Sequence, residues 1–207
     1  MEQTTYRVEA EKTTAKILTF FSLGLTSVLV FWFVTNPARF FNDLLGINQD
    51  AFQRVIPWIL ALFIAVGYII YTAKAVPFVQ KHLLTFSSLK ILGLWAAMVS
   101  STVEEILFRQ VLMDWLMGLN VSVPLQIIIS GIAFGVAHGA WIMLRGDIKI
   151  AFPVILSTTV LGALLAVLYI IADRNILLPI VTHIMINLII EPWLILSAVT
   201  GAWKNRH

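Results

Sequence analysis

Long apolar runs, most of them without charged residues, alternate with short polar connections along the whole chain. The runs that can form membrane-crossing helices are Ile17–Val34, Val55–Ala73, Ile91–Leu119, Val123–Leu144, Ile150–Ala172 and Ile176–Glu191. A transmembrane helix needs about 20 mostly apolar residues, and these runs are close to that length or longer. The pattern therefore predicts an all-α fold, a polytopic transmembrane helical bundle of about six spans.

The polar tails and connections divide the chain into four segments. They are a polar N-terminal tail (1–16), two N-terminal transmembrane helices with their loops (17–89), a helical core with polar faces (90–191), and a C-terminal hydrophobic segment with a basic tail (192–207). The tail contains Glu9 and Glu11, and no small-residue cleavage site follows the first run, so we expect a retained anchor. Pro192 interrupts the last run. The segment after it can continue the span, form an extra half-span that re-enters the membrane, or lie at the interface.

The composition supports a membrane protein and excludes other classes. The 207 residues are 59% hydrophobic and 12% charged, whereas soluble domains are roughly 45–50% apolar and about 25% charged. The net charge of +3 comes from basic residues spread thinly between the apolar runs, which form no phosphate-binding face. We therefore expect the lipid bilayer as a partner and no nucleic acid. Most Lys and Arg residues lie in the N-tail, the second and fourth loops and the C-tail, which favours cytoplasmic termini.

The chain contains no Cys, so disulfides, thiolate metal ligands and cysteine nucleophiles are excluded. Any catalytic group must come from His, Glu, Asp or Ser. The third run holds charged residues near its centre, where each costs roughly 2.5–3.5 kcal/mol on insertion scales. Glu104, Glu105 and Arg109 must therefore face the protein interior. Glu105 and Arg109 are one helical turn apart, which predicts an ion pair that leaves Glu104 free.

Two further runs carry polar residues one turn apart on a single helix face. Phe134 and His138 share a face of the fourth run, and His183 and Asn187 share a face of the sixth. Ionisable residues within a membrane are functional candidates by default. We expect Glu104, His138 and His183 to converge on a cavity that water can reach. Each residue also has a structural reading, because a buried ion pair can brace helices and a buried histidine can simply pack.

Asp114 and Glu191 lie near the ends of their runs, so we expect them at the membrane interface rather than in the site.

Three motifs follow one another on successive polar-faced runs. They are Glu104-Glu105-x-x-x-Arg109, Phe134-x-x-x-His138 and His183-x-x-x-Asn187. In this order they resemble the motifs of the CAAX-protease and bacteriocin-processing (CPBP, or Abi) family of intramembrane proteases. The resemblance covers roughly residues 90–191, about half of the chain, and departs at Gln110, where many members have glycine.

The resemblance implies catalytic roles for four residues. In that family the residues matching Glu104 and His138 activate water, and those matching His183 and Asn187 stabilise the oxyanion. Glu105, Arg109 and Phe134 would then orient the site. The cofactor is left open: Glu104, His138 and His183 are an acceptable ligand set for Zn²⁺ or another divalent metal, and a metal-free glutamate mechanism is the rival. The helical His-Glu-x-x-His motif of many zinc proteases is absent.

By this resemblance, the chain is expected to be an integral protein of a bacterial cell membrane. It would hydrolyse a peptide bond in a peptide or protein substrate in or at the membrane, in bacteriocin immunity or peptide maturation. The alternative is a non-catalytic membrane scaffold or partner-binding protein that retains the protease fold. A transporter also buries Glu, His and Arg at mid-membrane, but the sequence shows no inverted repeat.

Overall fold

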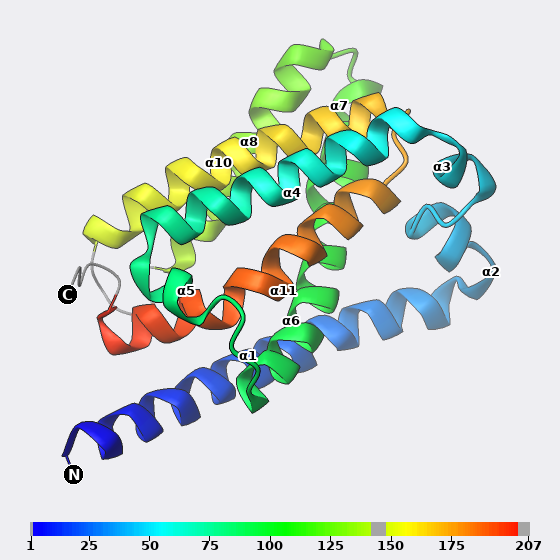
Figure 1. The fold of residues 1–207 in the computed structure, drawn as a ribbon. Coiled ribbons are helices and arrows are strands. Elements are labelled where there is room, and N and C mark those ends of the chain that lie inside the picture. Colours follow the sequence, from blue (N-terminus) through cyan, green and yellow to red (C-terminus); the bar gives the residue numbers. More distant parts are fainter. Residues whose placement is uncertain (1, 142–147, 203–207) are drawn as a thin grey trace.

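The computed structural model describes residues 2–141 and 148–202, and this part of the chain contains helices, turns and loops but no strand. Its main helices (Figure 1) are α1 (Glu2–Thr35), α4 (Val55–Ala75), α6 (Ser88–Glu105), α8 (Val123–His138), α10 (Ile148–Ile171) and α11 (Leu177–Thr200). The short elements between them are α2 (Pro37–Arg39), the π-helix η1 (Phe40–Leu44), α3 (Gln49–Gln53), α5 (Pro77–His82), the π-helix η2 (Ile106–Val111), α7 (Leu112–Gly118) and the 3₁₀ helix η3 (Gly139–Trp141). The predicted all-α fold is confirmed.

Within the described residues, five helical segments are long and apolar enough to cross a membrane. They are Val8–Thr35, Val55–Ala75, Ser88–Gly118, Ala151–Ile171 and Leu177–Thr200. The helix of the fourth predicted run, α8, is apolar but has only 16 residues, or about 24 Å of rise. It ends at His138, where the chain enters η3, instead of continuing to Leu144 as predicted. Residues 142–147 of that run lie outside the described part of the chain.

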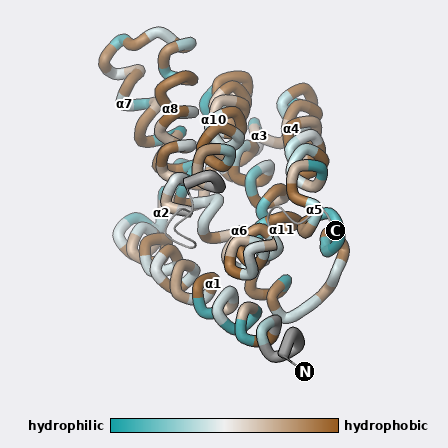
Figure 2. Tube along the Cα trace, turned by 90° about the vertical axis from the view of Figure 1, so that its left-hand side faces the viewer, coloured by the Kyte–Doolittle hydropathy of each residue, from teal (hydrophilic) through white to brown (hydrophobic). Residues whose placement is uncertain are grey.

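Large apolar side chains cover the outside of the bundle. Phe20, Phe63 and Leu156 are 75%, 72% and 57% exposed in the isolated chain. Figure 2 shows the hydrophobic colour along much of α8 and α10, with hydrophilic segments towards helix ends and loops. An apolar surface this extensive is typical of lipid contact rather than of a soluble protein.

Helices α6 and α11 form the centre of the bundle. In the most apolar 18 residues of Ser88–Gly118, which contains α6, and of α11, 56% of the residues are buried inside the bundle. The corresponding share in α1 is 11%. Helix α11 packs against α6, α4, α1 and α10, and α6 packs against α1 as well. The three helices that carry the predicted site therefore include the two most enclosed ones.

Helix α11 continues through Pro192 to Thr200, so the segment after this proline forms no separate half-span. Of the alternatives open from the sequence, the continuation is the one found. Proline lacks a backbone N–H and disturbs the helical hydrogen bonds around it. On α6, Lys90 Nζ donates to the Ile189 carbonyl, three residues before the proline, at 3.0 Å. Gly93 faces the Pro192 ring so closely that a Cβ there would overlap it.

Helices α8 and α10 pack at very short range because α8 has glycine at the contact. A Cβ on Gly135 would overlap the Thr159 side chain and lie 2.7 Å from the Ile155 carbonyl oxygen. In the opposite direction, Phe134 packs on Gly162, where a Cβ would lie 2.9 Å from the Phe134 Cβ. Close helix approach at small residues is a common way to associate helices in membranes. This contact fixes Phe134, and with it the C-terminal turn of α8.

Candidate active site

Three neighbouring helices carry the predicted site residues. Glu104 and Glu105 end α6, His138 ends α8, and His183 and Asn187 lie in the N-terminal half of α11. Helix α6 packs along α11, and η2, which continues α6, contacts α8. The helix crossing therefore brings together polar side chains that are far apart in the sequence.

Arg109, Glu105 and His183 form a buried polar group, which we call the inner group. Arg109 Nε lies 2.9 Å from Glu105 Oε2, and His183 Nδ1–H donates to Glu105 Oε1 at 2.9 Å. The three side chains are at most 1% exposed. The ion pair predicted from the Glu105–Arg109 spacing is present. Because Glu105 accepts from His183 Nδ1, it fixes the orientation of the ring and places the proton on Nδ1.

The second ring nitrogen of His183 faces Asn187. Asn187 Nδ2 lies 3.0 Å from His183 Nε2 and 3.3 Å from Ser101 Oγ on α6. A ring that donates through Nδ1 presents an acceptor at Nε2, so the Asn187 amide is the donor in this contact. The Asn187 N–H groups are thus held at the edge of the inner group, where a substrate oxygen could compete for them.

Glu104 and His138 form a second pair, which we call the outer pair, and this pair is accessible to solvent. Their side chains are 25% and 20% exposed, and Glu104 Oε2 lies 3.6 Å from His138 Nε2. His138 Nδ1–H donates to the Phe134 carbonyl at 2.9 Å, which directs Nε2 toward Glu104. Glu104 Oε2 has no hydrogen-bond partner among the described residues. A separation of 3.6 Å is too long for a direct hydrogen bond, and Glu104 Oε2 is itself buried, so the solvent-accessible part of the pair is formed by other atoms of the two side chains.

Phe134 lies between the outer pair and the inner group. Its ring centroid is 4.4 Å from that of His138 and 5.5 Å from that of His183. The Arg109 guanidinium lies over the same ring at 5.0 Å, a cation–π contact. Phe134 is fully buried, so it separates the solvent-accessible pair from the buried charges and fixes both histidine rings. The sequence prediction of a site-orienting Phe134 agrees with these contacts.

The π-helix η2 begins directly after Glu105 and contains Arg109. A π-helical turn leaves some backbone carbonyls without their usual donors, and such turns are frequent at functional sites. Ser130 of α8 fills this need, because its hydroxyl donates to the Phe108 carbonyl at 2.9 Å and accepts from Arg109 Nη1 at 2.8 Å. Ser130 therefore connects α8 to the inner group.

The predicted convergence of Glu104, His138 and His183 is found as two adjacent layers rather than as one ligand cluster. Glu104 contacts His138 and lies within electrostatic range of His183 and Arg109. Within residues 2–141 and 148–202, no three His, Asp or Glu side chains are placed so that they could hold a metal ion. His183 donates through Nδ1 to Glu105, and its remaining ring lone pair, on Nε2, accepts from Asn187. As placed in the described structure, the three side chains do not form the Zn²⁺ ligand set that the sequence left open beside a metal-free mechanism.

Sequence reasoning missed three polar residues at the site. Ser101 and Ser130 are fully buried and contact the inner group through their hydroxyls. Glu191, expected at the interface, lies one turn after Asn187 on α11, within electrostatic range of Glu104 and His183. Its Oε2 is buried without a hydrogen-bond partner among the described residues. The sequence did carry a signal for Glu191: it follows His183 by eight residues, about two helical turns, and therefore lies on a similar face of the helix.

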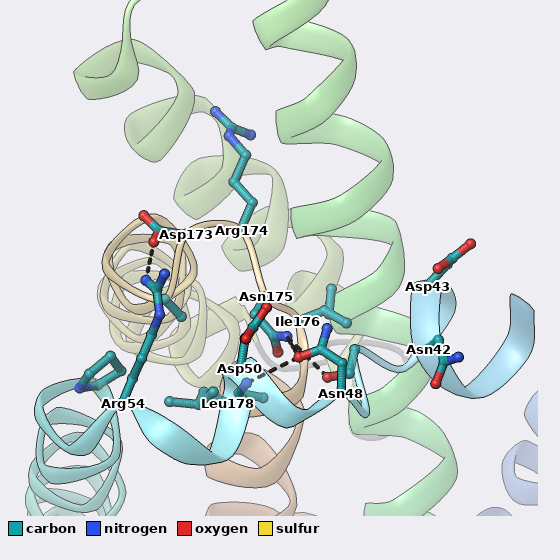
Figure 3. A pocket seen from close by; sticks show the side chains of 14 residues that line it. Asn42, Asp43, Asn48, Asp50, Arg54, Asp173, Arg174, Asn175, Ile176 and Leu178 are labelled. Carbon is teal, nitrogen blue, oxygen red and sulfur yellow. Dashed lines mark hydrogen bonds and ion pairs between the residues drawn. The ribbon is translucent and has the colours of Figure 1, made fainter.

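A polar cavity of about 240 Å³ lies elsewhere, where the loops after η1 and α10 meet the start of α11 (Figure 3). Its lining includes Asn48, Asp50 and Asn175, and an ion pair between Arg54 and Asp173 closes one side. None of the predicted site residues lines it. The cavity belongs to the connections between helices, not to the outer pair.

Comparisons with known proteins give one match. Residues 86–189 match the family model described as type II CAAX prenyl endopeptidase Rce1-like. The matched region begins just before α6 and ends within α11, so it contains the inner group and the outer pair. No curated protein and no solved structure matches the chain.

Proposed function

Since this chain belongs to the type II CAAX prenyl endopeptidase Rce1-like family, we propose that it is an intramembrane endopeptidase that hydrolyses a peptide bond in a membrane-associated substrate. The observation that carries this proposal is the solvent-accessible pair of Glu104 and His138 beside a buried group that presents N–H donors. Amide hydrolysis needs an activated water, a donor for the oxyanion and a proton for the leaving amine.

The outer pair supplies the activated water. A water that enters beside Glu104 and His138 transfers a proton to the Glu104 carboxylate while its oxygen attacks the carbonyl carbon of the peptide bond. The tetrahedral intermediate carries its negative charge on the former carbonyl oxygen. Glu104 then passes the proton to the amide nitrogen, the C–N bond breaks, and the products are a carboxylate and an amine.

The inner group supplies the oxyanion donors. At rest an Asn187 N–H occupies His183 Nε2, and a carbonyl oxygen that develops negative charge is a stronger acceptor for it. His183 contributes a second N–H when both of its ring nitrogens carry protons, and Glu105 stabilises that charged ring. Arg109 keeps Glu105 in place. A donor held ready in this way typically contributes about 10²–10³ in rate.

The finer assignment concerns substrate and location. We place the activity in a bacterial cell membrane, in peptide maturation or bacteriocin immunity, on the resemblance of the three motifs. The steps above are carried by groups of the chain itself, namely the Glu104–His138 pair and the donors around His183. A non-catalytic scaffold with the same fold is the alternative, and Glu104 distinguishes the two.

The test uses purified protein in lipid vesicles with two membrane-bound reporter peptides, one farnesylated with a CAAX end and one bilayer-spanning without a lipid. We expect the wild type to cleave at least one of them. Glu104→Gln should lower kcat by about 10²–10⁴, because it removes the general base. Its unfolding midpoint should stay near the wild-type value, since Glu104 Oε2 receives no hydrogen bond in the described structure.

Glu9→Gln is the matched control, because it removes an exposed carboxylate on α1 that pairs with Lys12, and it should leave cleavage unchanged. If Glu104→Gln cleaves as fast as the wild type, Glu104 is not the general base and the proposed mechanism is wrong. If the wild type cleaves neither peptide, the non-catalytic scaffold replaces the protease.

A further inference from the structure

We propose that Ser101 is a positioning residue that holds the Asn187 amide in the orientation needed for oxyanion binding. Ser101 is fully buried on α6, one turn before Glu104. Its hydroxyl oxygen lies 3.3 Å from Asn187 Nδ2. This proposal rests on the proposed peptidase function and adds a residue that none of the three motifs contains.

The Asn187 side chain needs an external contact to define its orientation. An asparagine amide has a donor end and an acceptor end of nearly the same shape, and a rotation of 180° exchanges them. In the reverse orientation the Asn187 carbonyl would face the substrate and repel an oxyanion. The contact to Ser101 Oγ occupies one N–H of Nδ2, and the contact to His183 Nε2 occupies the other.

These two contacts have different fates during the reaction. The N–H on His183 must be released to the oxyanion, because it is the one at the edge of the site. The N–H on Ser101 has no such role and can persist throughout the cycle. His183 Nε2, which only accepts, selects the donor end of the amide at rest, and Ser101 Oγ then keeps that end in place while the other N–H changes partner.

Ser101 also connects the two halves of the reaction. It lies on the same helix as Glu104, whereas Asn187 lies on α11. The hydrogen bond between them fixes the distance from the base to the oxyanion donor. Misplacing a catalytic group by about 1 Å can cost 10²-fold in rate, so this link should affect kcat rather than substrate binding.

The neighbouring Ser100 provides a matched control. Its hydroxyl is buried on the same helix turn but has no hydrogen-bond partner among the described residues. Replacing either serine by alanine removes the same atom from the same helix. Only Ser101→Ala should alter the orientation of Asn187.

The experiment measures kcat and KM for cleavage of the reporter peptide by the wild type, Ser101→Ala, Ser100→Ala, Asn187→Ala and the double variant of Ser101 and Asn187. We expect Ser101→Ala to lower kcat about 10-fold with KM unchanged, and Ser100→Ala to stay within about twofold of the wild type. The double variant should match Asn187→Ala, because Ser101 acts only through Asn187.

Ser101→Cys covers the case in which the alanine variant does not fold, because cysteine is nearly the same size and a weak acceptor. It should fold and lose kcat in the same direction. The proposal is overturned if Ser101→Ala and Ser101→Cys both keep the wild-type kcat, if Ser100→Ala loses as much, or if the two losses multiply in the double variant. Glu104→Gln separates this inference from the proposed function. Full activity in that variant overturns the proposed mechanism, whereas loss of activity in Glu104→Gln with unchanged Ser101 variants overturns only the role of Ser101.

Discussion

Glu104 and Glu105 are adjacent in the sequence but have opposite surroundings. Successive helical residues point about 100° apart, so Glu105 faces Arg109 and His183 while Glu104 faces His138 and solvent. Glu105 has ionic partners on both sides and is fully buried. Glu104 keeps one oxygen without a donor in the described structure, which suits a group that must take up a proton.

Removal of Arg109 tests the structural role of the inner group. Arg109→Ala should lower the free energy of unfolding by roughly 3–5 kcal/mol, because it leaves the Glu105 carboxylate buried without its cation. Denaturation in detergent micelles, followed by circular dichroism, measures this change. Arg39→Ala is the control, since Arg39 makes an exposed pair with Asp43 at 3.7 Å, and such pairs contribute less than about 1 kcal/mol. An Arg109→Ala protein that folds like the wild type but no longer cleaves would place Arg109 in the substrate site.

The residue contacts that could be predicted from the sequence are local ones. The Glu105–Arg109 pair follows from a spacing of four residues in a helix. The contact between His183 and Glu105 spans 78 positions, and that between Asn187 and Ser101 spans 86. Such contacts depend on how two helices are rotated about their axes, which apolar runs do not determine. For this reason the sequence placed His183 with Glu104, whereas the structure pairs it with Glu105.

At the level of elements, the boundaries of most helices could be predicted and their irregularities could not. Helices α4 and α10 begin and end within two residues of the predicted runs. The π-helix η2 left no signal in the apolar pattern, because it depends on Ser130 of another helix for its carbonyl partner. Pro192 indicated an interruption, but α11 continues through it to Thr200, and Lys90 and Gly93 of α6 contact this part of the helix.

The close contact of α8 with α10 gives a test at this scale. Gly135→Ala should lower the free energy of unfolding by about 1–3 kcal/mol, because the added methyl overlaps the Thr159 side chain and the helices must separate. Cleavage should fall as well, since Phe134 and His138 are set by this contact. Gly67→Ala in α4 is the matched control: nothing lies near its Cβ position, and alanine is the better helix former. A Gly135→Ala protein as stable and active as Gly67→Ala would show that the contact does not position α8.

For the whole molecule, composition and the pattern of apolar runs determine that it is a helical membrane protein. The packing of the helices determines how the polar residues of the candidate active site are arranged. Apolar side chains such as Phe63 face outward along spans that are charge-free in the sequence. The motif residues face inward on α6, α8 and α11, as expected from the cost of charges in lipid. What the apolar pattern could not supply is the division into a solvent-accessible pair and a buried group, because it depends on where Phe134 lies. The orientation with cytoplasmic termini stays a prediction from the charge distribution.

The central claim is that the outer pair activates a water molecule that attacks the peptide bond directly. A single-turnover cleavage in H₂¹⁸O, with enzyme in excess over the reporter peptide and products analysed by mass spectrometry, tests it most directly. We expect one ¹⁸O atom in the new carboxyl terminus of the first product and none in the enzyme peptide that contains Glu104. An unlabelled first product with ¹⁸O in Glu104 would contradict the claim, because it would mean that Glu104 attacks the substrate itself and water acts only on the resulting anhydride.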